Sequence, residues 1–341
     1  MKVAMYHGLN DIRIEEKSIP KIGEKEALVK MKACGVCGSD LMEWYLKSRA
    51  PLVLGHEPTG VIVEKGGKVK EFDVGDRVFV HHHVACLKCH YCMHGDYTLC
   101  SQFHETNIEP GGFAEYFRVP APNLQLDTLK IPDALSFEEA TLIEPVGCCL
   151  RALKKCNIKK EDSIAIIGAG ATGVIHTALS KIFGVGKTIV CDLVDFRLDM
   201  ARKFGADVTV NIAKDNLSEV VVAETDGRGV DVAVVTAPNL EAYKMGLKAC
   251  RKGGTLCIFA PTKPGEHLQI SPKELFFSEI RLIPSYSTSH IETREALELM
   301  KSGKLNLEGL ITHRFRLLDA AKAFKTALEN KESLKVIVFN E

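Results

Sequence analysis

The chain has a single tryptophan, and aromatic residues make up only 7% of its 341 residues. It also lacks an excess of either charge, since 44 lysines and arginines balance 44 aspartates and glutamates. Without a basic field, binding to nucleic acid or to an anionic membrane is not expected. No apolar run approaches the roughly 20 residues of a membrane-spanning helix, and residues 1–8 do not resemble a secretory signal. We therefore expect a cytoplasmic protein.

The remaining composition is that of an ordinary globular chain, with 46% apolar and 26% charged residues. A length of 341 residues favours two domains. The chain contains 12 cysteines. In a long chain without a secretory signal, cysteines indicate thiols or metal ligands rather than disulfides.

Two parts of the chain differ in their expected secondary structure. Residues 1–148 are rich in strand patterns, such as the alternating apolar positions of residues 27–33. Residues 149–287 alternate short apolar strands with helical segments, which predicts an α/β doubly wound parallel sheet. The tail, residues 288–341, contains two helical segments and a final strand. The six strands of the predicted parallel sheet are residues 164–167, 188–191, 208–211, 230–235, 255–259 and 281–283.

The turn after the first of these six strands carries three glycines, Gly168, Gly170 and Gly173, in the pattern GxGxxG. Glycine permits the tight turn, the approach of a pyrophosphate to the backbone, and close packing of the following helix. Ala171 and Thr172 lie between the last two glycines and complete the predicted phosphate site. The positive end of the helix dipole would face the phosphates.

Asp192 ends the second of these strands, 19 residues after Gly173. A carboxylate in this position accepts hydrogen bonds from the ribose hydroxyls of NAD, whereas it repels the 2′-phosphate of NADP. Arg197 follows nearby and is included in the predicted cofactor site. The sequence thus favours NAD over NADP.

Four closely spaced cysteines, Cys86, Cys89, Cys92 and Cys100, have the pattern C-x2-C-x2-C-x7-C. Four thiolates at such spacing close a tetrahedral cage with no open position, as a structural zinc site requires. An iron–sulfur cluster and unliganded thiols are the alternatives. Many iron–sulfur sequences that begin in this way continue with a third short gap and a proline, whereas here the last gap is seven residues and Ser101 follows.

Four further candidate zinc ligands, Cys37, His56, Glu57 and Glu144, are dispersed along the chain. Thiolate, imidazole and carboxylate all bind zinc, but only folding can bring these residues together. Cys37, His56 and one glutamate would neutralise Zn²⁺, and the second glutamate would make the site negative. We therefore expect one of the two carboxylates to be displaceable.

These motifs together resemble the zinc-containing medium-chain dehydrogenases/reductases, and among them the sorbitol, threonine and butanediol dehydrogenases. The resemblance covers essentially the whole chain and includes the nucleotide fingerprint and the four-cysteine lobe. The other motifs that carry it are Cys37-Gly-Ser-Asp40, Gly55-His-Glu57, Gly75-Asp-Arg-Val78, Gly111-Gly-Phe-Ala-Glu-Tyr116 and Ile143-Glu-Pro145.

The resemblance implies a GroES-like catalytic domain, residues 1–148 completed by 288–341, and a Rossmann NAD-binding domain, residues 149–287. It implies a catalytic zinc in the cleft between the domains. Cys37 and His56 match the first two ligands of this zinc, Glu57 matches the third, and Glu144 matches a glutamate that coordinates directly or through water. The four cysteines would hold a second, structural zinc, and the implied assembly is a homotetramer, with a dimer as the alternative.

The implied activity is the NAD-linked oxidation of a secondary alcohol (a polyol, diol or amino alcohol) to the ketone, and the reverse reaction. Zinc lowers the pKa of a bound hydroxyl, Ser39 matches the hydroxyl that takes the proton, and the alkoxide passes a hydride to the nicotinamide. Many relatives carry a histidine five residues after the zinc cysteine to pass the proton on, but this chain has Met42 there. The alternatives are an NADP(H)-preferring carbonyl reductase and a non-catalytic regulator that binds zinc and nucleotide.

Three consecutive histidines, His81, His82 and His83, follow the predicted strand at residues 77–80. A histidine run can bind metal, but successive strand residues point to opposite faces. We therefore expect that the three histidines do not share one ion, although one of them can line the cleft. Cys34 forms a C-x-x-C pattern with Cys37, and we expect it to be a small core residue.

Overall fold

The computed structural model describes residues 1–340 and divides into two compact units. The first unit comprises Met1–Gly147, Ser287–Gly303 and the chain from Ile311 onwards, and the second comprises Cys148–Tyr286 with Lys304–Leu310. The boundary near residue 147 falls within helix α6 (Ile143–Lys155). Within residues 1–340, no helix is long and apolar enough to cross a membrane.

A seven-stranded sheet forms the centre of the first unit, and a three-stranded sheet accompanies it. The larger sheet contains β3 (Ala27–Val36), β5 (Pro58–Lys65), β6 (Arg77–Val80), β7 (Tyr116–Val119), β8 (Thr128–Lys130), β15 (Ile311–Arg316) and β16 (Lys335–Phe339). The smaller sheet contains β1 (Lys2–Gly8), β2 (Asp11–Glu16) and β4 (Leu52–Val53). The helices of this unit are η1 (Gly38–Leu41), α1 (Glu43–Leu46), α2 (His90–Met93), η2 (Tyr97–Leu99), α3 (Ser101–Glu105), α4 (Ala121–Asp127), α5 (Phe137–Ala140), α12 (His290–Lys301), η3 (Leu317–Asp319) and α13 (Ala320–Glu329).

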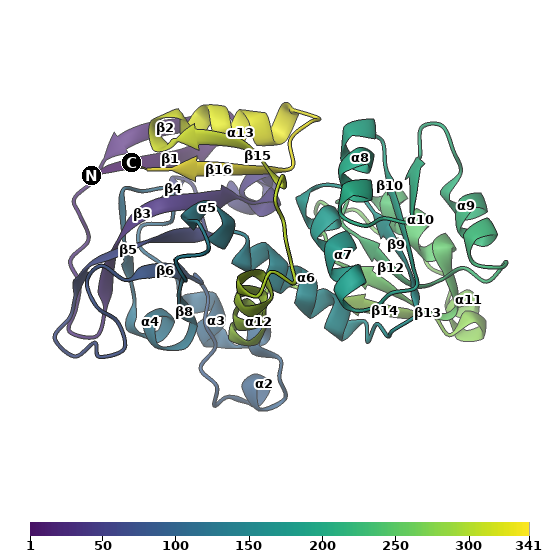
Figure 1. The fold of residues 1–341 in the computed structure, drawn as a ribbon, viewed down its shortest axis with the longest axis horizontal. Helices are drawn as coiled ribbons and strands as arrows, with labels where there is room; N and C mark the ends of the chain where they lie inside the picture. The colour runs from purple at the N-terminus through teal and green to yellow at the C-terminus, as the bar shows by residue number, and fades with distance from the viewer. Residues whose placement is uncertain (341) are drawn as a thin grey trace. The chain divides into compact units, whose positions relative to one another are not determined.

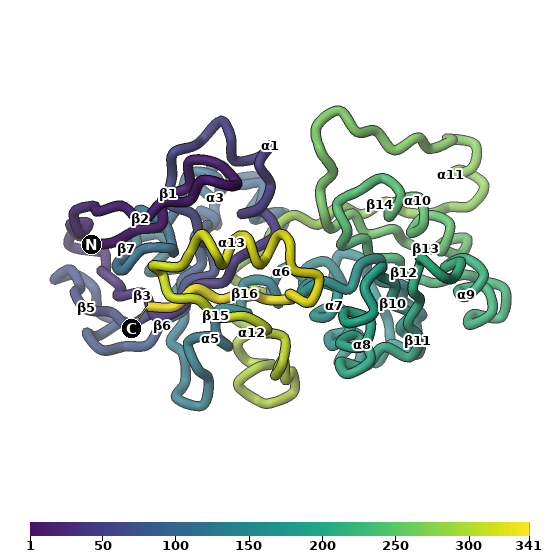
Figure 2. The backbone as a smooth tube through the Cα atoms, turned by 90° about the horizontal axis from the view of Figure 1, so that it is seen from above, coloured from purple at the N-terminus to yellow at the C-terminus, as the bar shows by residue number. Residues whose placement is uncertain are grey.

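The C-terminal tail is an integral part of the first unit. The strand order is β15-β16-β3-β5-β6-β8, with β7 also paired to β3, so the last strand of the chain lies beside β3 (Figure 2). Phe324 on α13 is 2% exposed and packs edge to face on Phe113, with 5.4 Å between the ring centroids. Burial of a phenylalanine side chain stabilises a fold by roughly 1.5–3 kcal/mol.

Three neighbouring strands bring residues that are distant in sequence to one end of this sheet. β5 runs antiparallel to β3 and to β6, and the register places Cys34 opposite Pro58 and Thr59 opposite Phe79. The start of β5 therefore lies between the ends of β3 and β6. Residues that follow β3, precede β5 or follow β6 consequently share one end of the sheet.

The second unit contains the predicted parallel sheet, and all six strands expected from the sequence are present. Their order, β11-β10-β9-β12-β13-β14, is that of the doubly wound dinucleotide-binding fold. Helices α7 and α8 lie on one side of the sheet, and α9 and α10 on the other (Figure 1). The elements are β9 (Ser163–Ile167), α7 (Ala171–Ile182), β10 (Lys187–Asp192), α8 (Asp195–Lys203), β11 (Val208–Asn211), α9 (Leu217–Glu224), β12 (Val230–Val235), α10 (Leu240–Ala249), β13 (Cys250–Ile258), α11 (Pro272–Ser278) and β14 (Arg281–Pro284).

Candidate active site

Three of the four dispersed ligand candidates meet at the end of the seven-stranded sheet. Ligand atoms of Cys37, His56 and Glu57 all lie within 4.8 Å of one another. Cys37 directly follows β3, while His56 and Glu57 directly precede β5, and the antiparallel pairing of these strands brings them together. A thiolate, an imidazole and a carboxylate at these separations form a donor set that fits zinc.

Asp40 holds two of these residues in place. Its Oδ2 accepts a hydrogen bond from the backbone N–H of Cys37 at 3.0 Å, and its Oδ1 lies 3.4 Å from Nδ1 of His56. Burial lowers the pKa of His56, but the charges of Asp40 and Cys37 outweigh burial and raise this pKa well above its usual value. A carboxylate behind a ligating histidine orients the ring and increases its basicity. The sequence motif contained Asp40 but did not reveal this role.

The carboxylate of Glu57 forms a buried ion pair with Lys335, at the start of β16. Glu57 is 0% exposed and Lys335 is 3% exposed. Gly35 makes room for the pair, because a Cβ at this position would lie 1.8 Å from Oε2 of Glu57 and 2.7 Å from Cε of Lys335. Burial raises the pKa of Glu57, and the charge of Lys335 opposes this effect. Sequence reasoning missed Lys335, since nothing local to it in the sequence connects it with a residue near the other end of the chain.

Glu144, the fourth candidate ligand, lies beside this group rather than within it. It is in the first turn of α6 and is 5% exposed. It interacts electrostatically with both Glu57 and Lys335, which places its carboxylate near the ion pair. Among the described residues, however, the set of mutually close ligand atoms contains only Cys37, His56 and Glu57. Direct ligation by Glu144 therefore stays a prediction.

Ser39 and Met42 occupy the short helical segment that follows Cys37. Ser39 lies in η1 and is partly buried, and Met42 is the residue at which η1 ends and α1 begins. The hydroxyl predicted to take the substrate proton is thus two residues from the zinc cysteine. The side chain of Met42 is a thioether, which has no proton to exchange and cannot pass a proton on.

The three consecutive histidines lie close together, but they do not form a group of metal-ligand atoms among the described residues. β6 ends at Val80, and His81, His82 and His83 follow the strand instead of continuing it. The ring centroids of His82 and His83 are 3.9 Å apart, and those of His81 and His82 are 5.2 Å apart. Burial lowers the pKa of His82 well below its usual value and that of His83 to about 3, so these rings are neutral near pH 7.

The four closely spaced cysteines form a second group of ligand atoms within 4.8 Å of one another. Sγ of Cys92 lies 3.5 Å from Sγ of Cys89 and 4.0 Å from Sγ of Cys86. The backbone N–H of Cys86 points at Sγ of Cys100 at 3.3 Å. A backbone hydrogen bond from Lys88 lowers the pKa of Cys86 to about 6, whereas burial raises the pKa of Cys92 to about 12.

The lobe around these cysteines has little apolar core of its own. Its buried cluster consists of Ala85, Cys92, Cys100 and Phe103, and two of these four residues are cysteines of the group. Folded segments with so small a core generally depend on a metal or on disulfides. The cage geometry and the small core together fit a structural zinc ion.

The glycine turn of the second unit has the geometry that the fingerprint requires. Gly168 has a φ of +106°, in the left-handed region that favours glycine. A Cβ at Gly173 would lie 2.0 Å from the carbonyl oxygen of Gly168, so the helix packs directly on the turn. A Cβ at Gly170, the N-cap of α7, would meet no atom of residues 1–340 within 4 Å. The open space at Gly170 is where a pyrophosphate would approach the backbone.

The carboxylate of Asp192 is held beside this turn. One oxygen accepts a hydrogen bond from the backbone N–H of Ala169 at 2.7 Å, and the other accepts one from the N–H of Val194 at 3.0 Å. Ala171 and Thr172 form the first turn of α7, and Arg197 lies in α8. The predicted cofactor residues thus gather at the ends of β9 and β10 within the second unit.

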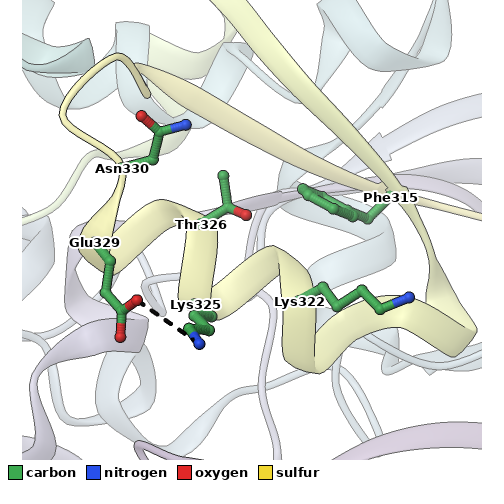
Figure 3. A pocket seen from close by; sticks show the side chains of 6 residues that line it. All are labelled: Phe315, Lys322, Lys325, Thr326, Glu329 and Asn330. Atoms are coloured by element: carbon green, nitrogen blue, oxygen red, sulfur yellow. Dashed lines mark ion pairs between the residues drawn. The ribbon is translucent and has the colours of Figure 1, made fainter.

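A surface hollow of about 510 Å³ lies elsewhere, between α13 and β15 (Figure 3). Its charged residues already have partners, since Lys325 pairs with Glu329 at 4.0 Å and Lys322 with Asp319 at 2.7 Å. None of its lining residues belongs to either group of metal-ligand atoms found among residues 1–340. We therefore place the chemistry at Cys37 and His56 and not in this hollow.

Comparison with known proteins identifies the family of this chain. The family model for the alcohol dehydrogenase GroES-like domain matches residues 23–133, and that for zinc-binding dehydrogenases matches residues 171–302. The chain is 36% identical over 349 residues to the sorbitol dehydrogenase of Bacillus subtilis, an alignment that covers 99% of this chain and 97% of that protein. The chain belongs to the zinc-containing medium-chain alcohol dehydrogenases.

Solved structures of related enzymes have the same fold along their whole length. A zinc-binding dehydrogenase from Sinorhizobium meliloti, solved with NADP, has a TM-score of 0.89 and 28% identity, with 99% of this chain and 98% of that chain covered. The 2R,3R-butanediol dehydrogenase of Bacillus subtilis has a TM-score of 0.87 and 28% identity, covering 100% and 99%. This member of the family is accordingly an oxidoreductase that acts on CH–OH groups with zinc and a nicotinamide cofactor.

Proposed function

We propose that this dehydrogenase oxidises the secondary alcohol of a polyol, diol or amino alcohol to the ketone with NAD, and catalyses the reverse reaction. The observation that carries the proposal is the meeting of Cys37, His56 and Glu57 at one end of a buried sheet, with Asp40 behind the histidine. The similarity to a sorbitol dehydrogenase and a butanediol dehydrogenase supports the substrate class.

We propose two zinc ions per chain, one in the four-cysteine lobe and one at Cys37 and His56. When bound at Cys37 and His56, zinc acts as a Lewis acid that lowers the pKa of the alcohol hydroxyl. Because the charge of Lys335 neutralises Glu57, we propose that Glu57 keeps its ion pair with Lys335. Glu144 is then the carboxylate that can be displaced from zinc. Cys37 and Glu144 then carry the two negative charges that balance the ion, which removes the excess charge noted from the sequence. We propose that Ser39, two residues after Cys37, takes the hydroxyl proton.

A substrate panel tests the proposed function. Purified enzyme should oxidise at least one of 2,3-butanediol, sorbitol, 1,2-propanediol or threonine with NAD, with a kcat/KM about tenfold or more above that for 2-butanol. Activity confined to carbonyl reduction with NADPH would favour the carbonyl reductase. Binding of zinc and nucleotide without turnover of any substrate would favour the non-catalytic regulator.

Replacing Asp192 with alanine is expected to relax cofactor choice. The variant loses the charge that repels a 2′-phosphate, so the ratio of kcat/KM with NAD to that with NADP should fall at least about tenfold. Asp195→Ala is the matched control, because Asp195 is an exposed carboxylate nearby that pairs with Lys214 at 3.1 Å. Steady-state rates with both cofactors measure the change. A wild-type enzyme that prefers NADP would contradict the assignment of Asp192.

A further inference from the structure

His82 is a polar side chain beside the zinc ligands that the proposed mechanism does not use. Its ring centroid lies 5.0 Å from that of His56. This proximity follows from the sheet register, because His56 precedes β5 and His82 follows β6 at the same end of the sheet. The two groups of metal-ligand atoms among residues 1–340 do not include His82.

The backbone around His82 is held by buried side chains. The Nδ2 amide of Asn123, which is 0% exposed, donates hydrogen bonds to the carbonyl oxygens of His81 at 3.0 Å and of His82 at 2.8 Å. The neighbouring ring is also fixed, since Nδ1 of His81 lies 2.9 Å from Oδ2 of Asp127, and the other Asp127 oxygen accepts from Thr293 Oγ1 at 2.7 Å. His82 is therefore presented on a rigid support, as a binding residue must be.

The ring nitrogens of His82 differ from those of its neighbours. His81 and His83 each use Nδ1, the first with Asp127 and the second with the carbonyl of Thr106. Nδ1 of His82 is enclosed by protein and has no hydrogen-bond partner within residues 1–340. His82 is only partly buried, and Nε2 is not among the enclosed atoms that lack a partner. With Nδ1 unengaged, either tautomer is available, and Nε2 can donate or accept a hydrogen bond.

We propose that His82 binds the substrate, through a hydrogen bond from its ring to a hydroxyl or amino group next to the alcohol that reacts. The role rests on the proposed function and identifies the residue that would make the enzyme prefer polyhydroxy or amino alcohols to simple ones. A site built to hydrogen-bond a substrate group rejects the analogue that lacks it, because the polar side chain is then left without a partner.

The test compares substrates that differ by one hydroxyl. The pairs are 2,3-butanediol with 2-butanol and 1,2-propanediol with 2-propanol, assayed with the zinc-loaded enzyme and NAD. His82→Phe keeps an aromatic ring against His56 and His83 but removes both nitrogens. It should lower kcat/KM for the diols about tenfold or more, mainly through KM, and change the values for the simple alcohols by less than about twofold. His82→Gln, which retains hydrogen-bonding groups, should recover part of the preference for diols.

Zinc content and melting temperature of both variants accompany the rates. Both are expected to match wild type, because the proposed role is to bind substrate and not to hold metal or fold. Loss of zinc in His82→Phe, or an equal loss of rate on both members of each pair, would overturn the role. A wild-type enzyme that oxidises 2-butanol as well as 2,3-butanediol would overturn it too, while leaving the dehydrogenase activity intact. Failure to oxidise any alcohol would instead refute the proposed function, and this role with it.

Discussion

Replacing Cys37 with alanine is expected to lower kcat by roughly a thousandfold or more, because the substrate hydroxyl loses its Lewis acid. Cys37 contributes the only thiolate to the group it forms with His56 and Glu57 among the described residues, and it lies outside β3. Its loss should therefore remove about one zinc ion per chain while the sheet stays folded. Rates with the best alcohol of the panel, zinc analysis and a thermal melt measure the three effects.

Cys34→Ala is the matched control for this variant. Cys34 is fully buried in β3, and burial is the main cause that raises the pKa of its thiol well above the usual value, so it behaves as a small core residue. The control should keep both zinc ions and near wild-type kcat, with a loss of stability of about 1 kcal/mol. An active Cys37→Ala enzyme, or an inactive Cys34→Ala enzyme that is folded and holds two zinc ions, would contradict the assignment.

Replacing Cys89 with alanine should have its largest effect on stability. The buried cluster of the lobe has only four residues, so we expect the proposed zinc ion to supply most of the stability of the lobe. Structural zinc sites of this kind contribute about 10–16 kcal/mol to the folding of isolated peptides. The variant should lose the zinc ion of the four-cysteine lobe, and the lobe should become sensitive to proteases at residues 84–106. The melting temperature should fall by about 10 °C or more.

Tyr91→Ala provides the comparison for Cys89→Ala. Tyr91 lies in the same short helix, α2, and is 46% exposed, so its removal changes the lobe surface without removing a ligand. This control should keep two zinc ions and resist proteolysis like wild type. Directly after purification, Cys89→Ala should still turn over substrate, because Cys37 and His56 are unchanged. A Cys89→Ala protein with two zinc ions and an unshifted melt would show that the lobe does not depend on metal.

Most of the fold was predictable from the sequence because its signals are local. The parallel sheet of the second unit appears in the sequence as six short apolar strands separated by helical segments, and almost all residues of its central strands β9 and β12 are buried. The glycine turn and the four cysteines were equally clear, since steric demand at Gly168 and Gly173 and the short spacing of Cys86 to Cys100 act within one segment of chain. The homotetramer implied by the resemblance stays a prediction.

The contacts at the site that the sequence did not reveal have a common physical cause, which is that pairing between distant strands decides which side chains meet. The sequence did not show that His82 lies against His56, because β6 ends at Val80 and only the register of β6 with β5 brings the two rings together.

The residues alone predicted a dinucleotide site and a four-cysteine zinc site, because the chemistry of pyrophosphate and zinc sets those residue types and spacings. The dehydrogenase activity followed from the resemblance of the motifs to a known family. Only the tertiary structure decided how the two glutamates differ. The pairing of β16 with β3 delivers Lys335 to Glu57, and the absence of a side chain at Gly35 leaves room for both, while Glu144 comes from a separate helix. No local pattern encodes that difference, since a buried charge is stabilised only by the partner that folding brings to it.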